Sequence, residues 1–146
     1  MRVSPRYSCC VDLHLILRRH RQVLLGRRIG TGFADGMYGV PSGHLEDGEA
    51  VTAGLIREAA EETGVVVEAA DLRFVHAMHH RTDEGRIALF FEAGKWTGDI
   101  LNREPDKCAG WRWFDLRGLP DPVVTYLAEA LRKIAEGIPY SERGWE

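Results

Sequence analysis

The chain has 146 residues, of which 45% are hydrophobic and 28% are charged, and its formal net charge at pH 7 is −3. This length suits a single domain over residues 1–146 with one hydrophobic core. The slight acidity gives no reason to expect a nucleic acid polymer as a partner, and no apolar run reaches the length of a membrane span. The three cysteines predict neither a disulfide framework nor a zinc site. The N-terminal residues lack the apolar segment of a signal peptide, so we expect a cytoplasmic protein, either a monomer or a homodimer.

The first part of the chain predicts a β-hairpin. Residues 8–18 (SCCVDLHLILR) alternate with period two, and residues 22–28 (QVLLGRR) predict a second strand after a tight connection. The arginines of this hairpin have two interpretations. They form a solvated edge that discourages strand pairing, or they steer a polyphosphate towards a site, for which Arg27 is the preferred candidate. A glycine-rich loop (29–36) and a short strand (37–40) follow, where Phe33 and Tyr38 either pack in the core or stack on a base.

Residues 50–63 (AVTAGLIREAAEET) predict a helix, because they contain no proline and end at Gly64, which suits a C-cap. On a helical wheel, Glu58, Glu61 and Glu62 fall within an arc of about 100°. We expect the opposite side to be buried, namely Ala53, Ile56, Ala59, Ala60 and Thr63. Val51 and Leu55 lie near the carboxylate side, and we expect a neighbouring loop to cover them.

The three glutamates of this helix repel one another by a few tenths of a kcal/mol per pair. Arg57 is the only basic side chain in the helix and cannot neutralise all three. A divalent cation would turn this cluster into a site, because Mg²⁺ takes carboxylate oxygens and keeps water and substrate phosphates as its other ligands. A glutamate-rich helix by itself is more often a solvated face.

The second half of the chain predicts further strands and one more helix. Residues 65–67, 72–80 (LRFVHAMHH) and 86–92 (RIALFFE) predict strands, with a turn at 82–85. We interpret the three histidines of the second strand as ordinary strand or rim residues, because neighbours on a strand point to opposite faces. Residues 111–114 (WRWF) predict the last strand and residues 122–135 an amphipathic helix. The tail either packs Tyr140 and Trp145 against the domain or frays. These elements predict an α/β layered domain.

One stretch has a highly specific pattern of spacing, and it runs from Gly43 to Val65 (GHLEDGEAVTAGLIREAAEETGV). Its fixed identities are Gly43, Glu49, Arg57, Glu58, Glu61, Glu62 and Gly64, with apolar Ala59 and Val65. From average residue usage, these seven identities should occur in one register by chance on the order of 10⁻⁷–10⁻⁶ times in such a chain. The stretch resembles the signature of the Nudix hydrolases, Gly-x5-Glu-x7-Arg-Glu-U-x-Glu-Glu-x-Gly-U with U apolar. Weaker likeness to MutT-type members extends over most of the chain.

The resemblance implies a Nudix fold, with a mixed β-sheet sandwiched between α-helices and the signature forming a loop–helix–loop. It implies water attack on a diphosphate linkage of a nucleotide substrate, with Mg²⁺ as cofactor and Mn²⁺ as a substitute. Carried over residue by residue, Glu58 and Glu62 are the principal metal ligands, Glu61 assists or holds a metal-bound water, and the Gly43 carbonyl contributes. Glu49 is the structural partner of Arg57. Eight residues span about 12 Å along a helix, so this pairing requires Glu49 to fold back from a loop.

A further carboxylate is expected outside the signature. In several MutT-like members a glutamate from another loop approaches the metals, and the corresponding candidate for the general base is Glu104, placed by the rigid Pro105. Glu92 and Asp106 compete for this role, and a solvated loop carboxylate is the alternative. Asp106 is also a candidate for reading the edge of a base, together with Asp35 and Asn102.

The expected substrate class depends partly on absent residues. The proline expected of ADP-ribose hydrolases is replaced by Arg81, and the tyrosine expected of dinucleoside polyphosphate hydrolases would fall near Thr82. We therefore predict hydrolysis of a nucleoside or deoxynucleoside triphosphate to the monophosphate and pyrophosphate. Cleavage of ADP-ribose or a nucleotide sugar is the alternative. A nucleotide-sensing module would be favoured by loss of signature carboxylates, and none is lost. An isopentenyl diphosphate isomerase has little support from Cys9 and Cys10.

Overall fold

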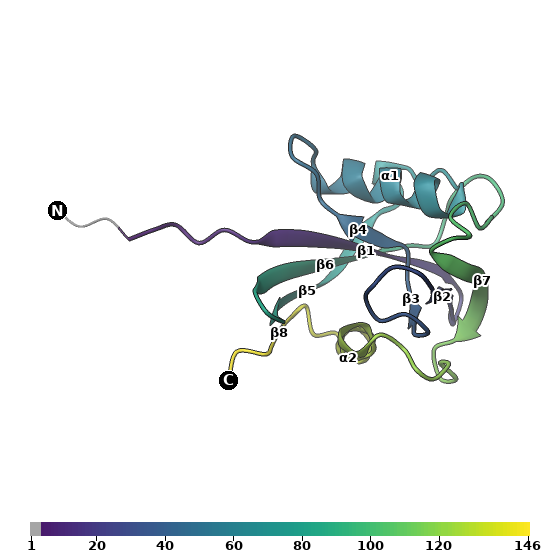
Figure 1. Cartoon of the computed structure of the whole chain (residues 1–146). Helices are drawn as coiled ribbons and strands as arrows, with labels where there is room; N and C mark the ends of the chain where they lie inside the picture. The colour runs from purple at the N-terminus through teal and green to yellow at the C-terminus, as the bar shows by residue number, and fades with distance from the viewer. Residues whose placement is uncertain (1–3) are drawn as a thin grey trace.

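The computed structural model describes residues 4–146, which form two helices packed against β-structure (Figure 1). The helices are α1 (Val51–Thr63) and α2 (Thr125–Ala135), and a single 3₁₀ turn, η1, covers Ala69–Asp71. The strands are β1 (Cys10–Arg19), β2 (Gln22–Arg28), β3 (Tyr38–Gly39), β4 (Ser42–His44), β5 (Arg73–Arg81), β6 (Gly85–Ala93), β7 (Cys108–Asp115) and β8 (Tyr140–Arg143). None of the helices in this part of the chain is long and apolar enough to cross a membrane.

The sheet is mixed and has the strand order β3-β2-β1-β6-β5-β8, with β4 paired to β1 and β7 paired to β2. The β1–β6 and β5–β8 pairs are parallel, whereas the others are antiparallel. The β1–β2 ladder contains only the pairs Arg18↔Val23 and Arg19↔Gln22. Beyond them β2 diverges from β1 and pairs with β3 and β7, while β4 pairs with the other end of β1. This divergence makes room for a cleft between the strands.

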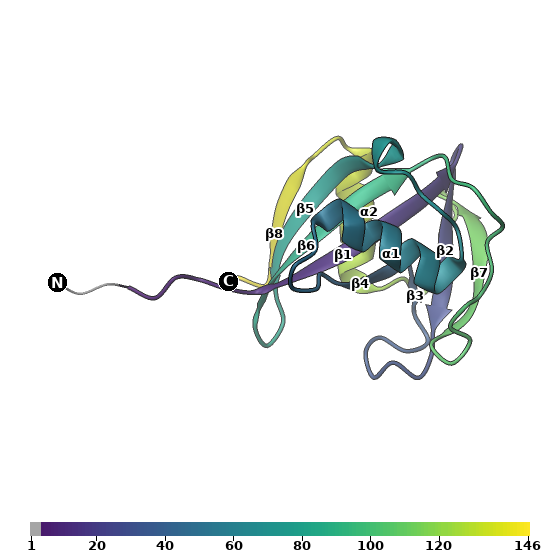
Figure 2. The same cartoon turned by 90° about the horizontal axis from the view of Figure 1, so that it is seen from above.

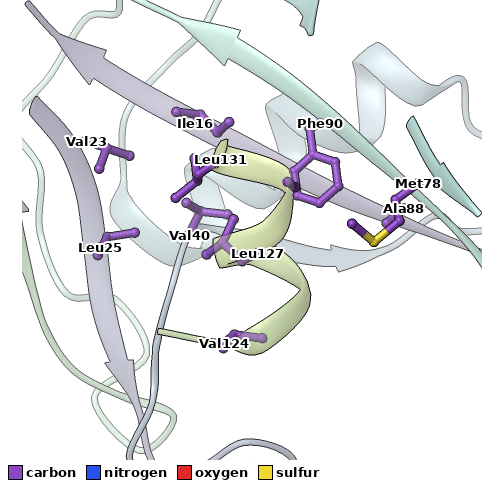
Figure 3. Packing of buried hydrophobic residues seen from close by; sticks show 11 residues of the cluster. Ile16, Val23, Leu25, Val40, Met78, Ala88, Phe90, Val124, Leu127 and Leu131 are labelled. Carbon is purple, nitrogen blue, oxygen red and sulfur yellow. The ribbon is translucent and has the colours of Figure 1, made fainter. Parts of the chain in front are cut away.

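The two helices cover opposite faces of the sheet, as Figures 1 and 2 show. Strand β1 is therefore buried on both sides. Leu13, Leu15 and Leu17 share one core cluster with Leu55 of α1, whereas Ile16 belongs to a second cluster that contains the α2 residues. Figure 3 shows this second cluster around α2. Its labelled members are Ile16, Val23, Leu25, Val40, Met78, Ala88, Phe90, Val124, Leu127 and Leu131. The structure confirms the expected mixed sheet between helices.

The buried face of α1 differs from our prediction. The helix ends as expected at Gly64, whose φ of 79° lies in the left-handed region that glycine adopts without strain. However, Ala53 and Ala60 are exposed, and the buried residues are Gly54, Leu55, Glu58, Ala59 and Thr63. Leu55 belongs to a core cluster that contains Leu13, Leu15 and Leu17 of β1. The helix therefore turns part of its carboxylate face towards the sheet.

Several other predictions were wrong in detail. Residues 65–67 form no strand, and only Val66 makes a single bridge, with Thr97. Strand β4, which is three residues long and contains Gly43, was not predicted. The strand around Trp111–Phe114 is longer than predicted and is not the last one. The tail adds β8 beside β5, and the Trp145 indole N–H donates to the His79 carbonyl at 2.8 Å, so the tail packs back on the domain.

Candidate active site

A cleft of about 1100 Å³ opens where β1 and β2 diverge, and α1 forms one of its walls. Glu58, Glu61 and Glu62 line the cleft together with Arg57 and Gly43. Side chains from the end of β2 and from the loop before β7 line it as well, among them Arg27, Glu104 and Lys107. The structure thus brings the predicted carboxylates of the helix and the predicted loop carboxylate into one cavity.

Arg57 organises the acidic wall of this cleft. Its guanidinium binds Glu49 through two hydrogen bonds, Nε to Oε2 at 3.0 Å and Nη2 to Oε1 at 2.7 Å. Its Nη1 also donates to Glu58 at 2.9 Å and to Glu61 at 3.2 Å. The Glu49 loop folds back as the pairing requires, and Glu49 also accepts the N–H of Glu46 at 2.8 Å. Hydrogen bonds between ionised groups are roughly twice as strong as neutral ones, so Arg57 fixes the loop and the helix to each other.

Glu58 is buried and Glu62 partly buried, and the two carboxyl groups are close enough to shift each other's pKa. Glu58 is only 8% exposed and lies directly against Gly43, where an added Cβ would be 2.0 Å from Oε1 of Glu58. Glu62 accepts the N–H of Ser42 at 3.0 Å. Burial and the neighbouring Glu58 together raise the pKa of Glu62 to about 10. Burial also raises the pKa of Glu58. Without a cation the pair therefore retains a proton.

The carboxyl pair has the donor chemistry of a divalent cation site, because a cation between the two groups would replace the shared proton. Because Gly43 has no side chain, the main chain of β4 lies directly against the Glu58 carboxylate. Within residues 4–146, no three Asp, Glu, His or Cys side chains lie in the arrangement of a preformed metal centre. Mg²⁺ takes one or two protein carboxylates and completes its coordination with water and substrate phosphates. Glu58 and Glu62 fit such an ion, with the half-exposed Glu61 beside them.

Glu104 faces this pair from a separate loop. The N–H groups of Lys107 and Cys108 close a turn on the Glu104 carbonyl, at 2.9 and 3.0 Å. The Asn102 side chain spans the turn, since its amide donates to the Cys108 carbonyl at 2.7 Å and its oxygen accepts the Glu104 N–H at 3.3 Å. Asn102 is thereby engaged in building the loop, and our expectation that it reads a base edge was wrong.

The predicted substrate residues fall into two groups. Arg27 and Phe33 line the cleft, and Phe33 is 51% exposed. Tyr38 and Asp106 are not among the cleft residues, and Tyr38 packs against Phe114 with ring centroids 5.4 Å apart. Tyr38 therefore has the packing role that we had considered as its alternative. Asp35 also makes local bonds, accepting the N–H groups of Thr31 and Gly32 within its own loop.

The far wall of the cleft was missed by sequence reasoning. It contains a charged cluster in which Arg86 binds Asp12 through two hydrogen bonds of 2.7 and 2.9 Å. It also contains His14, which is hydrogen-bonded to the Tyr126 hydroxyl at 2.7 Å, and His80, which stacks on the Tyr126 ring. Burial lowers the pKa of His14 to about 4, so this imidazole is neutral at pH 7. These residues come from β1, β5, β6 and α2, and no sequence motif connects them.

A carboxylate-lined cleft beside a mixed sheet is suited to binding a divalent cation together with a phosphorylated substrate. A family model described as NUDIX domain matches residues 11–135, which is most of the chain. The chain therefore belongs to the NUDIX family, and it is a MutT-like Nudix hydrolase. This confirms the family that the signature between Gly43 and Val65 indicates.

Known proteins that resemble the chain differ in their substrates. An RNA pyrophosphohydrolase from Novosphingobium aromaticivorans is 29% identical, over 89% of this chain and 91% of the relative. An ADP-ribose pyrophosphatase from Methanocaldococcus jannaschii is 30% identical over 72% of this chain and 61% of its own length. The chain spans less than half the length of the relatives named NAD-capped RNA hydrolase. A crystal structure of a MutT NUDIX hydrolase from Burkholderia pseudomallei superposes with a TM-score of 0.79 at 26% identity, covering 86% of this chain and 98% of the other.

Proposed function

We propose that this Nudix hydrolase cleaves a nucleoside or deoxynucleoside triphosphate to the monophosphate and pyrophosphate, with Mg²⁺ as cofactor. The observation that carries the proposal is the composition of the cleft, in which the acidic wall of Glu58, Glu61 and Glu62 lies in the same cavity as Arg27 and Lys107. A triphosphate is strongly anionic. It needs cations along its length and a place where one phosphoanhydride bond meets both a metal and an activated water.

Each group has a role in this proposal. A divalent cation held by Glu58 and Glu62 would neutralise phosphate oxygens and lower the pKa of a bound water. Arg27 and Lys107 hold the polyphosphate chain by charge. Glu104 accepts the proton of the attacking water, and the aromatic ring of Phe33 offers a surface on which a base stacks. Arg57 and Glu49 orient the loop and the helix without touching the substrate.

The 5′-triphosphate end of an RNA is the second candidate. It carries the same reacting group as a free nucleotide, and the relative named RNA pyrophosphohydrolase matches the chain over most of both lengths. Because of this similarity, the absence of a nucleic acid partner stays a prediction. A third candidate substrate is a nucleoside diphosphate joined to another group, because one relative is named ADP-ribose pyrophosphatase.

A substrate panel tests the proposal. The purified protein is incubated with Mg²⁺ and each ribonucleoside and deoxyribonucleoside triphosphate, a short 5′-triphosphorylated RNA, ADP-ribose and a nucleotide sugar. We expect a free triphosphate to give the highest kcat/KM, with pyrophosphate and no orthophosphate as the released product. The Glu62→Gln variant serves as the control for contaminating phosphatases. Preferential cleavage of ADP-ribose or a nucleotide sugar over every triphosphate would contradict the proposal, and preferential cleavage of the RNA end would establish the second candidate.

A further inference from the structure

The last turn of α1 has hydrogen-bond partners outside the helix. The last carbonyl groups of a helix accept no hydrogen bond from within the helix, so they need donors from elsewhere. Here the Thr63 carbonyl accepts the N–H of Leu101 at 2.9 Å. The Glu62 carbonyl accepts the N–H of Arg103 at 3.3 Å and the indole Nε1–H of Trp111 at 3.2 Å. Three hydrogen bonds therefore join the end of the helix to a segment about forty residues further along the chain.

The same segment carries Glu104, which follows Arg103 directly. The turn that presents Glu104 is closed on its own carbonyl by main-chain donors and is spanned by the Asn102 amide, so it is a rigid unit. The helix end carries Glu62 and the loop carries Glu104. The hydrogen bonds between these two elements thus hold the main chain of Glu62 against the main chain of Arg103, next to Glu104.

Trp111 is the one side chain among these three donors, and the strand behind it is adapted to its ring. Trp111 lies on β7 opposite Gly26 of β2. A Cβ at Gly26 would come within 2.8 and 2.9 Å of two ring carbons of Trp111, so the ring occupies the space that a side chain there would take. The ring also lines the cleft. The indole N–H links β7 to α1 at the residue that carries a proposed metal ligand.

The carboxylates need such a link, because like charges close together in a buried site repel one another. Glu62 lies one helical turn after Glu58, and Glu104 lines the same cleft. Movement of the helix end away from the loop would relieve this repulsion. We propose that Trp111 is a positioning residue, whose indole N–H holds the main chain of Glu62 so that the Glu62 carboxylate stays in register with Glu58 and Glu104. This inference rests on the proposed function of these glutamates.

Trp111→Phe tests the inference, because it removes the N–H and keeps an aromatic ring. We expect kcat to fall about tenfold or more while the KM for the nucleotide stays within twofold, since displacement by a fraction of an ångström is costly in a site of fixed geometry. Mn²⁺ titration of the substrate-free protein, followed by the electron spin resonance signal of free Mn²⁺, should show weaker binding by threefold or more. Trp111→benzothienylalanine, which exchanges the N–H for sulfur in a ring of the same shape, should behave in the same way.

Trp113→Phe is the matched control. Trp113 lies two residues further along β7, stacks on Trp96 with centroids 5.9 Å apart and carries Arg19 over its ring, but it is not a cleft residue. It should keep both kcat and Mn²⁺ affinity. Equal losses in the Trp111 and Trp113 variants would overturn the inference, as would a rise in KM with unchanged kcat and Mn²⁺ binding. A wild-type protein that cleaves no triphosphate would refute the proposed function, whereas the Mn²⁺ comparison would still decide the role of Trp111.

Discussion

Replacing Gly43 by alanine tests how closely the main chain of β4 and the Glu58 carboxylate must approach. The added Cβ would lie 2.0 Å from Oε1, 2.3 Å from Cδ and 2.7 Å from Oε2 of Glu58. Ordinary van der Waals contact begins at 3.4 Å, so the carboxylate would have to move by roughly 1.4 Å. Glu58 is buried and held by Arg57 at 2.9 Å, which leaves it little freedom to move without breaking that bond.

A misplacement of about 1 Å in an active site costs on the order of 10²-fold in rate, and this is the loss of kcat that we expect for Gly43→Ala. The added methyl group should also lower the free energy of unfolding by about 1–3 kcal/mol. Steady-state kinetics with the best nucleotide of the panel and urea unfolding measure the two effects. Gly118→Ala is the control, because among residues 4–146, its two chain neighbours aside, no atom lies within 4 Å of a Cβ added there. A Gly43→Ala protein with kcat within threefold of wild type would refute the argument.

Three further substitutions test Glu62, Glu104 and the basic residue Arg57. Glu62→Gln should keep the fold and lower kcat by orders of magnitude; near-normal activity with Mg²⁺ would contradict the assigned site. Burial and Glu58 together raise the pKa of Glu62 to about 10. The contribution of protonated Glu62 to stability is therefore complete below the ordinary pKa of 4.5 and is lost as pH rises towards 10. The Tm of the metal-free wild type should therefore fall more steeply than that of Glu62→Gln between pH 5 and 9, and parallel curves would argue against the buried pair. Glu104→Gln should lower kcat with little change in the Mg²⁺ concentration for half-maximal activity; loss of metal affinity alone would make Glu104 a ligand. The Arg57→Lys side chain cannot hold Glu49 by two hydrogen bonds, so the variant should lose kcat and also about 1–3 kcal/mol in the free energy of unfolding measured by denaturant titration. A fully stable and fully active variant would show that a single positive charge at this position suffices.

Local features of the sequence were sufficient to predict the elements that bear the chemistry. The helix of residues 51–63 follows from its composition and from Gly64 behind it, and the spacing of the glutamates places them on one side of that helix. The pairing of Arg57 with Glu49 could also be predicted, because the signature implies it and a loop allows the chain to fold back. These predictions depend on residues within about twenty positions of one another, where helical geometry determines the distances.

The orientation of that helix could not be obtained in the same way. A rule that buries apolar residues and exposes charged ones selects the face with Ala53 and Ala60, yet both are exposed and Glu58 is buried. The rule fails here because Arg57 donates a hydrogen bond to Glu58, the main chain of Ser42 donates one to Glu62, and Gly43 leaves space for the Glu58 carboxylate. Ser42 and Gly43 belong to β4, whose three residues are too few for a periodic signal.

The far wall of the cleft depends entirely on tertiary structure. Asp12 meets His44 through the β1–β4 ladder and receives Arg86 across the parallel β1–β6 ladder, although these residues are separated by 32 and 74 positions. Burial tends to raise the pKa of Asp12, but hydrogen bonds from Arg86 and His44 bring it below the usual range. The amino-acid sequence alone determined the helix, its carboxylates and the family. The tertiary structure decided which charges share the cleft with them, because strand register over long separations sets those contacts and leaves no local pattern in the chain.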